Sequence, residues 1–261
     1  MGVSRWAAAL LLSGCTVYNP AFLGSELPVI PVQPLDTVAS SIWSAHGSVG
    51  KPLTYHYGEN DKNELLSFGV YRRYSRAYRR LLYFPQQRGV SFAYGAMAYA
   101  GRYQAARGST PLTTYHYHGG MLHGAMRHHL GGSERLSLVL ETSASLFFEG
   151  GEYFREFNPV NQAGLVAPIL AFFSLPLVAS LQVSFMPHLQ LNRHWSITNA
   201  YTAGLTGYDI LSYYQFSGAL AVSRQRFTLW SRAALHLSTS SSFDSPRWTV
   251  TTGLSYHFRT K

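Results

Sequence analysis

The sequence predicts an all-β protein, an antiparallel up-and-down transmembrane β-barrel of about ten strands within a range of eight to twelve. Three observations predict this fold class. Apolar and polar residues alternate with a period of two over most of the chain after residue 39. The alternating segments are long. Charged residues make up 13% of the chain and aromatic residues 15%.

The alternation is clearest between residues 135 and 148. Leu138, Leu140 and Leu146 lie at one parity, and Ser137, Ser143 and Ser145 lie at the other. Successive side chains of a strand point to opposite faces of a sheet, so this pattern gives one apolar and one polar face. The same pattern recurs at 213–223, 227–238 and 247–259.

Strand length separates a membrane barrel from a soluble sandwich. A tilted membrane strand needs about 9–11 residues, whereas strands of soluble proteins average about 5–6. Most of the predicted strands reach the longer class. They are 40–50, 64–73, 89–104, 113–129, 134–148, 177–191, 194–206, 213–223, 226–238 and 247–259.

The lengths of the connections give the barrel an orientation. Bacterial barrels have short periplasmic turns and longer outer loops. Short turns are predicted at 130–133, 192–193 and 224–225, and longer loops at 51–63, 105–112, 149–176, 207–212 and 239–246. Residues 74–88 should form an inner turn but are long, and the apolar segment 161–176 is compatible with a loop helix, a plug or an irregular strand.

The net charge of +9 raises the question of nucleic acid. A protein exported from the cytoplasm does not meet nucleic acid routinely, so we expect no nucleic-acid partner. Basic side chains near a membrane surface can instead face anionic lipid head groups. Outer-membrane lipid is therefore the expected partner, together with other outer-membrane proteins.

The first fifteen residues have the three zones of a signal peptide. A charged start that contains Arg5 precedes an apolar run from Trp6 to Leu12, and small residues follow just before Cys15. The apolar run is far shorter than the roughly 20 residues that a membrane-spanning helix needs. Cys15 is the only cysteine of the chain.

The segment Leu12-Ser13-Gly14-Cys15 resembles the lipobox of bacterial lipoproteins. The resemblance implies removal of residues 1–14 and acylation of Cys15 on its sulfur and amine, which gives a lipid-anchored outer-membrane protein. Residues 15–38 contain four prolines and are predicted to be an irregular tether, and 39–261 to be the barrel. The layout resembles lipidated outer-membrane β-barrels common in Bacteroidota. The alternating Leu254, Tyr256 and Phe258 resemble a barrel insertion signal, although Arg259-Thr260-Lys261 follows.

Histidines invite a metal hypothesis. His116 and His118 share one face of a predicted strand, so they are weak candidates for chelating a metal, while His123 and His129 are expected on the opposite face and His128 on the same face. Strong zinc sites supply three or four ligands. We therefore predict neither a metal site nor a cofactor.

A lipid-modifying enzyme, similar to the lipid A deacylases, is the enzymatic alternative. It needs a histidine beside a serine, oriented by a carboxylate. Pairs two residues apart occur three times, and the nearby acids are Glu59 or Glu64 for the first pair and Asp244 for the third. The pairs are His46 with Ser48, His194 with Ser196, and His236 with Ser238. Such pairs arise by chance in a chain rich in both residues, so the balance is against an enzyme.

Aromatic and basic residues have predicted positions in a barrel. Tyrosine and tryptophan gather at the two membrane interfaces, which places eight residues in these girdles. They are Tyr94, Tyr99, Tyr115, Tyr117, Trp195, Tyr201, Trp248 and Tyr256. Five arginines should point inward or lie at the rims, because a charge facing mid-bilayer lipid costs about 2–4 kcal/mol. These are Arg102, Arg127, Arg135, Arg232 and Arg247.

The sequence therefore predicts a barrel with a structural, accessory-subunit or surface-binding role. A narrow porin-like channel for anions is the first alternative, because inward arginines with few acids such as Glu141 would make the lumen electropositive. A lumen filled by its own side chains is favoured at this size, since barrels of about sixteen strands or more leave open channels.

Overall fold

The chain forms a closed antiparallel barrel of ten strands in the computed structural model, which describes residues 40–51, 62–77, 89–105, 112–132, 135–157, 177–208, 211–238 and 247–259. Its elements are β1 (Ser40–Lys51), β2 (Lys62–Ala77), β3 (Gly89–Ala105), β4 (Thr113–Gly132), β5 (Leu136–Gly151), α2 (Glu152–Phe157), β6 (Leu177–Gln190), β7 (Trp195–Tyr208), β8 (Leu211–Arg224), β9 (Phe227–Ser238) and β10 (Arg247–Arg259). Residues 1–39, which contain Cys15 and the predicted tether, and 158–176 lie outside this description.

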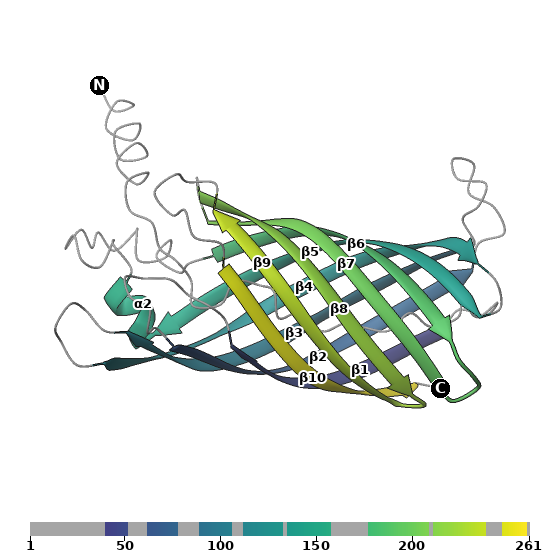
Figure 1. Cartoon of the computed structure of the whole chain (residues 1–261), viewed down its shortest axis with the longest axis horizontal. Coiled ribbons are helices and arrows are strands. Elements are labelled where there is room, and N and C mark those ends of the chain that lie inside the picture. Colours follow the sequence, from purple (N-terminus) through teal and green to yellow (C-terminus); the bar gives the residue numbers. More distant parts are fainter. Residues whose placement is uncertain are drawn as a thin grey trace, which may run out of the picture.

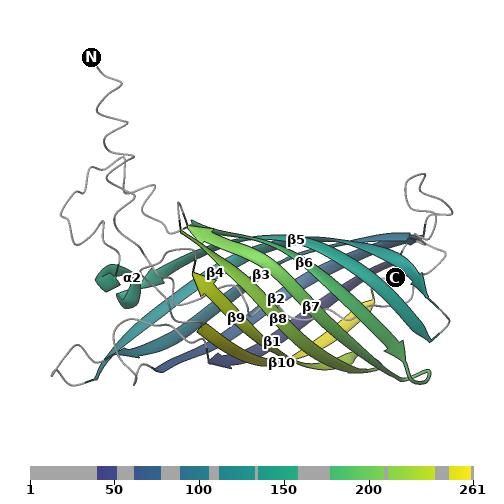
Figure 2. The same cartoon turned by 45° about the horizontal axis from the view of Figure 1, so that its top comes forward.

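The barrel closes because β1 pairs with both β2 and β10. Ala45 of β1 lies opposite Val70 of β2 on one side and Tyr256 of β10 on the other. Every other strand pairs with its neighbours in sequence, so the topology is up-and-down, and Figures 1 and 2 show the strands tilted strongly around the wall. Closure leaves no free strand edge, which suits a wall that faces lipid.

The two ends of the barrel differ. We call the end with Ser40, Arg259 and the short turns after β4, β6 and β8 the turn end, and the opposite end the loop end. The helix α2 lies at the loop end, beside β4 and β5 (Figure 1). The connections after β4, β6 and β8 are short, as predicted, with residues 133–135, 191–194 and 225–226 between the strands, although β4 continues through 130–132, where the first turn was predicted.

Two predicted connections are wrong. Strand β2 continues to Ala77, so the connection to β3 is 78–88 rather than 74–88. Arg72 and Arg73 lie on opposite faces of β2, and charge on both faces hides the alternation. At the loop end, only residues 209–210 separate β7 from β8, because the ladder continues to Tyr208 opposite Leu211. That loop is as short as the turns.

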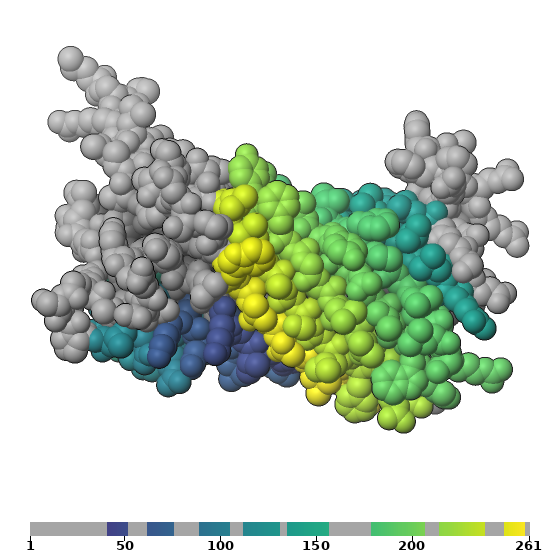
Figure 3. Space-filling view, in the orientation of Figure 1, coloured from purple at the N-terminus to yellow at the C-terminus, as the bar shows by residue number. Residues whose placement is uncertain are grey.

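The outer wall is apolar and exposed. Leu66, Phe68 and Leu181 are 63%, 60% and 63% exposed, and outward residues of the other strands resemble them. A continuous apolar band of this kind around a molecule is far larger than the patches of a few hundred Å² that soluble proteins expose. Figure 3 shows this wall over β7 to β10 as an unbroken surface. With inward polar faces and a closed ladder, the band identifies a membrane β-barrel.

Among the described residues, no helix combines the length and the apolar character that crossing a membrane requires.

Aromatic residues flank the apolar band at the turn end. The guanidinium of Arg224 lies over the ring of Trp195 at 5.3 Å, and that of Arg72 lies over Trp43 at 5.5 Å. Stacked pairs of this kind suit the level of the lipid head groups, where the ring meets apolar chains and the cation meets water. Among the predicted girdle residues, Tyr94, Tyr201, Trp195 and Trp248 face outward as expected.

The girdle prediction is wrong for Tyr99 and Tyr117, which are 4% and 1% exposed and point into the barrel. Their positions have the inward parity of β3 and β4. Tyr115 is partly buried and packs against the same internal cluster.

Candidate functional site

The lumen holds most of the polar side chains of the described strands. Serines and threonines occupy much of the inward face, interrupted by six histidines, three arginines and two glutamates. The inward histidines, arginines and glutamates are His46, His123, His129, His188, His236, His257, Arg73, Arg127, Arg232, Glu141 and Glu149. Nearly all inward side chains have less than a tenth of their surface exposed, so the lumen is filled rather than open.

An ion pair anchors the middle of the lumen. The Nε of Arg127 on β4 donates to Oε2 of Glu141 on β5 at 2.5 Å, and the two side chains are 2% and 13% exposed. Cross-strand register places the two residues directly opposite one another. A pair this deep is held by mutual neutralisation, because either charge alone would be strongly disfavoured.

Charged groups on distant strands act on one another at this level. Arg232 comes from β9, yet it lies within electrostatic range of Glu141 on β5, His123 on β4 and Tyr71 on β2. The strand order places β9 five strands away from β4. Charged and polar groups from both halves of the wall therefore influence one another in the middle of the lumen.

Hydrogen bonds organise the layer nearer the turn end. Both ring nitrogens of His257 form hydrogen bonds. Nδ1 lies 2.7 Å from Ser44 Oγ, and Nε2 lies 2.8 Å from Thr228 Oγ1. His188 makes a 2.8 Å hydrogen bond through Nδ1 with Thr198 Oγ1. Arg73 from β2 lies within electrostatic range of both histidines, so a buried positive charge lies near this layer.

A tyrosine cluster fills one side of the loop end. Tyr99, Tyr103, Tyr117 and Tyr153 pack together with ring centroids 5.0 to 6.4 Å apart, and all four are almost fully buried. Tyr153 belongs to α2, so the short helix caps this part of the lumen. The Tyr117 hydroxyl donates to Oδ1 of Asn63 at 2.7 Å, which fixes the cluster to β2.

Amide and hydroxyl groups fill the other side of the loop end. The Nε2 group of Gln182 on β6 donates to Oε1 of Gln215 on β8 at 3.2 Å, and Thr206 Oγ1 on β7 donates to Ser180 Oγ at 2.9 Å. Both glutamines are buried. The network joins three strands, β6, β7 and β8.

Glycines let large rings lie flat against the inner wall. A Cβ added to Gly253 would lie 2.4 Å from Trp230, and one added to Gly101 would lie 2.2 Å from Tyr117. Backbone and ring therefore touch where a side chain would force them apart. Trp230 reaches over to a cluster of apolar residues from β5 to β8: Val139, Met186, Ala200 and Ala221.

The predicted faces of the histidines on β4 are confirmed. His123 and His129 are buried in the lumen, whereas His116, His118 and His128 face outward. His116 and His118 therefore offer a metal two donors on one face. Within the described residues, no group of three or more His, Cys, Asp or Glu side chains is close enough to hold a metal ion.

None of the three predicted His–Ser pairs is a described contact. Ser48 bonds Ser67 rather than His46, whose ring nitrogens have no hydrogen-bond partner among the described residues. His194 is exposed in a turn, while Ser196 is buried on β7. The side chain of Ser238 lies outside the described ones, as do Glu59 and Asp244. Glu64 faces outward, so the prediction that it could reach the first pair is wrong.

The structure forms other His–Ser contacts that the sequence reasoning missed. Besides Ser44 with His257, the Nδ1 of His123 lies 2.9 Å from Ser145 Oγ, beside Glu141. Both residues are buried inside the barrel, where a lipid in the surrounding membrane does not reach them. The sequence shows that these residues lie on the inward faces of neighbouring strands. Which histidine lies beside which serine depends on the register between the strands, which the sequence does not give.

The arginine prediction is confirmed where side chains are described. Arg127 and Arg232 point inward, and Arg102 and Arg135 lie at opposite rims. The side chain of Arg247 is outside the described ones. Arg73, a third inward arginine, was missed because it falls at the edge of the segment predicted to be a turn.

Comparison with known proteins gives similarity of fold only. No protein-family model matches the chain, and no curated protein matches it either. Solved structures similar to it include the translocator domain of the autotransporter NalP from Neisseria meningitidis (8% identity, 85% of this chain and 89% of that chain, TM-score 0.43). The β domain of the Bordetella autotransporter BrkA is 13% identical over 85% and 100% of the two chains, with a TM-score of 0.38. An outer membrane channel from Pseudomonas putida F1 is 8% identical over 93% and 100%, with a TM-score of 0.36. Values this low bear on no question of activity or partner.

Proposed function

We propose that this protein is a bacterial outer-membrane barrel with a filled lumen, which works as a structural or accessory component through its outer wall and loop end. Outer-membrane lipid is its immediate partner, and other outer-membrane proteins are the expected partners of the exposed loop end. The apolar band and the closed ladder support the membrane location, because bacterial outer membranes are where such barrels reside.

The observation that carries the proposal is the burial of the inward side chains. Arg127 and Arg232 in the middle, and Arg73, His188 and His257 nearer the turn end, each have less than a tenth of their surface exposed. Side chains packed this closely leave no room for hydrated ions to pass. A barrel of this size is also small enough for side chains to fill.

A narrow anion channel is the second candidate. Three inward arginines against two inward glutamates among the described side chains favour it, because an electropositive lumen attracts anions. Planar-bilayer recording separates the two roles. A filled barrel passes no steady current, whereas an anion channel passes a current that follows the anion gradient.

We further propose that Cys15 carries a lipid anchor, as its lipobox resemblance implies. Cells that express the protein and take up radioactive palmitate should label the native chain, and Cys15→Ser should abolish the label. The variant should still enter the membrane fraction, because the barrel wall itself holds it there. Equal palmitate labelling of the native protein and of Cys15→Ser would contradict the proposed lipid anchor at Cys15.

A further inference from the structure

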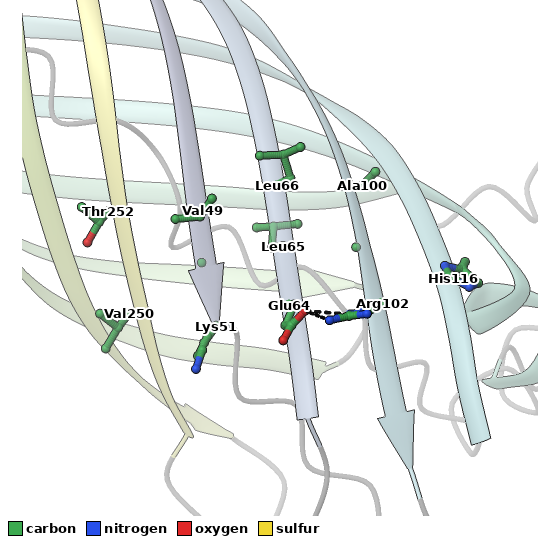
Figure 4. A pocket seen from close by; sticks show the side chains of 12 residues that line it. Val49, Lys51, Glu64, Leu65, Leu66, Ala100, Arg102, His116, Val250 and Thr252 are labelled. Carbon is green, nitrogen blue, oxygen red and sulfur yellow. Dashed lines mark hydrogen bonds and ion pairs between the residues drawn. The ribbon is translucent and has the colours of Figure 1, made fainter. Parts of the chain in front are cut away.

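A groove of about 590 Å³ lies on the outer wall near the loop end. Figure 4 shows its lining, which comes from β10, β1, β2, β3 and β4. The side chains that form it face outward, toward the membrane, except for Leu65, which is buried on the inner face of β2. The groove combines a row of charged and polar groups with an apolar floor.

The polar row runs around the wall at one level. Register places Glu64 of β2 opposite Arg102 of β3, and Arg102 opposite His116 of β4. The Arg102 guanidinium contacts Glu64 Oε2 at 2.6 Å, with both side chains about half exposed, so its remaining N–H groups stay accessible. Lys51 at the end of β1 is exposed and has no hydrogen-bond or ion-pair partner among the described residues (Figure 4).

The floor continues from this row toward the middle of the wall. Val49 and Leu66 lie opposite one another in the next row, and Leu66 lies opposite Ala100. Ala100 is followed on the same outward face of β3 by Ala98 and Ala96. Larger outward residues, Phe68 on β2 and Leu122 on β4, stand on either side of this alanine strip. The result is a shallow track with apolar walls.

We propose that the groove binds one phosphate-bearing lipid, with its head group at Lys51, Arg102 and His116 and an acyl chain along the alanine strip. Charge complementarity supports this occupant, since Lys51 and Arg102 carry two positive charges against the one carboxylate of Glu64, and this net positive charge favours a phosphate monoester or diester. The row lies where the strands end, at the head-group level, where outward charges cost only about 0–1 kcal/mol. A soluble anion would leave the apolar floor facing membrane and gain nothing from it.

The test uses the full-length protein in dodecyl maltoside micelles with dimyristoylphosphatidylglycerol as the probe. Native mass spectrometry counts the lipids retained per barrel as lipid concentration rises. The native protein should retain one lipid at low concentration. K51A/R102A should raise the concentration needed by at least about tenfold. Ala100→Phe, which fills the track and leaves every charge in place, should weaken retention as well.

Controls keep the outcome decisive. Arg224→Ala removes an exposed arginine from the other end of the wall and should leave retention unchanged. Dimyristoylglycerol, which lacks phosphate, should not be retained, and millimolar inorganic phosphate should not displace the phospholipid. Folding of each variant is checked by its heat-dependent gel mobility. Equal retention of the two lipids, displacement by free phosphate, or the same loss in Arg224→Ala would each overturn the proposal.

Discussion

Replacing Glu141 by alanine should destabilise the barrel by about 3–5 kcal/mol, because the change leaves the guanidinium of Arg127 buried without its carboxylate. Arg232 loses a nearby negative charge at the same time. The free energy of unfolding is measured by urea titration in lipid vesicles, with the folded fraction read from gel mobility without heating.

The double variant R127M/E141L provides the matched comparison. Removing both charges and keeping the volume apolar should restore most of the lost stability, as in other buried ion pairs exchanged for apolar residues. If Glu141→Ala lowered the free energy of unfolding by less than about 1 kcal/mol, water would have to solvate the guanidinium of Arg127 in the variant. The middle of the lumen would then be wet and open.

Trp230→Ala should cost about 3–5 kcal/mol of unfolding free energy, since it removes a ring that is 1% exposed and leaves a cavity inside the barrel. The ring covers Gly253 and its Nε1 donates to Ser255 Oγ at 3.2 Å. The same urea titration measures the effect.

Trp248→Ala is the matched control for this prediction. Trp248 is on the neighbouring strand β10, but it faces outward and is 52% exposed, so lipid takes the place of the missing ring and no cavity forms. Trp248→Ala should therefore lower the free energy of unfolding by clearly less than Trp230→Ala does. Equal losses would show that Trp230 does not pack a filled interior.

The wall of this barrel was readable from sequence because a strand has one strong local signal. Period-two alternation located all ten strands and assigned His123 and His129 to one face and His116 and His118 to the other. The edges were harder to predict where charges interrupted the pattern, as at Arg72 and Arg73. Tyr99 was misplaced although its parity, opposite to that of Tyr94, already assigned it to the lumen.

The contacts inside the barrel could not be predicted in the same way. Alternation tells which side chains point inward, but not which strands face one another or at what height. The approach of Arg232 to Glu141 depends on closure between β1 and β10 and on the stagger of the strands. The alignment of Lys51, Arg102 and His116 along the outer groove depends on the same stagger.

The filled lumen is the central claim, and current through single inserted barrels tests it most directly. The native protein, purified and inserted into a planar bilayer, should give no steady conductance under a salt gradient. A variant with Tyr71→Ser and Arg232→Ser, which removes two large buried side chains from the lumen, should conduct once its folding is confirmed by gel mobility. A steady, anion-selective current from the native protein would contradict the claim and establish the channel instead.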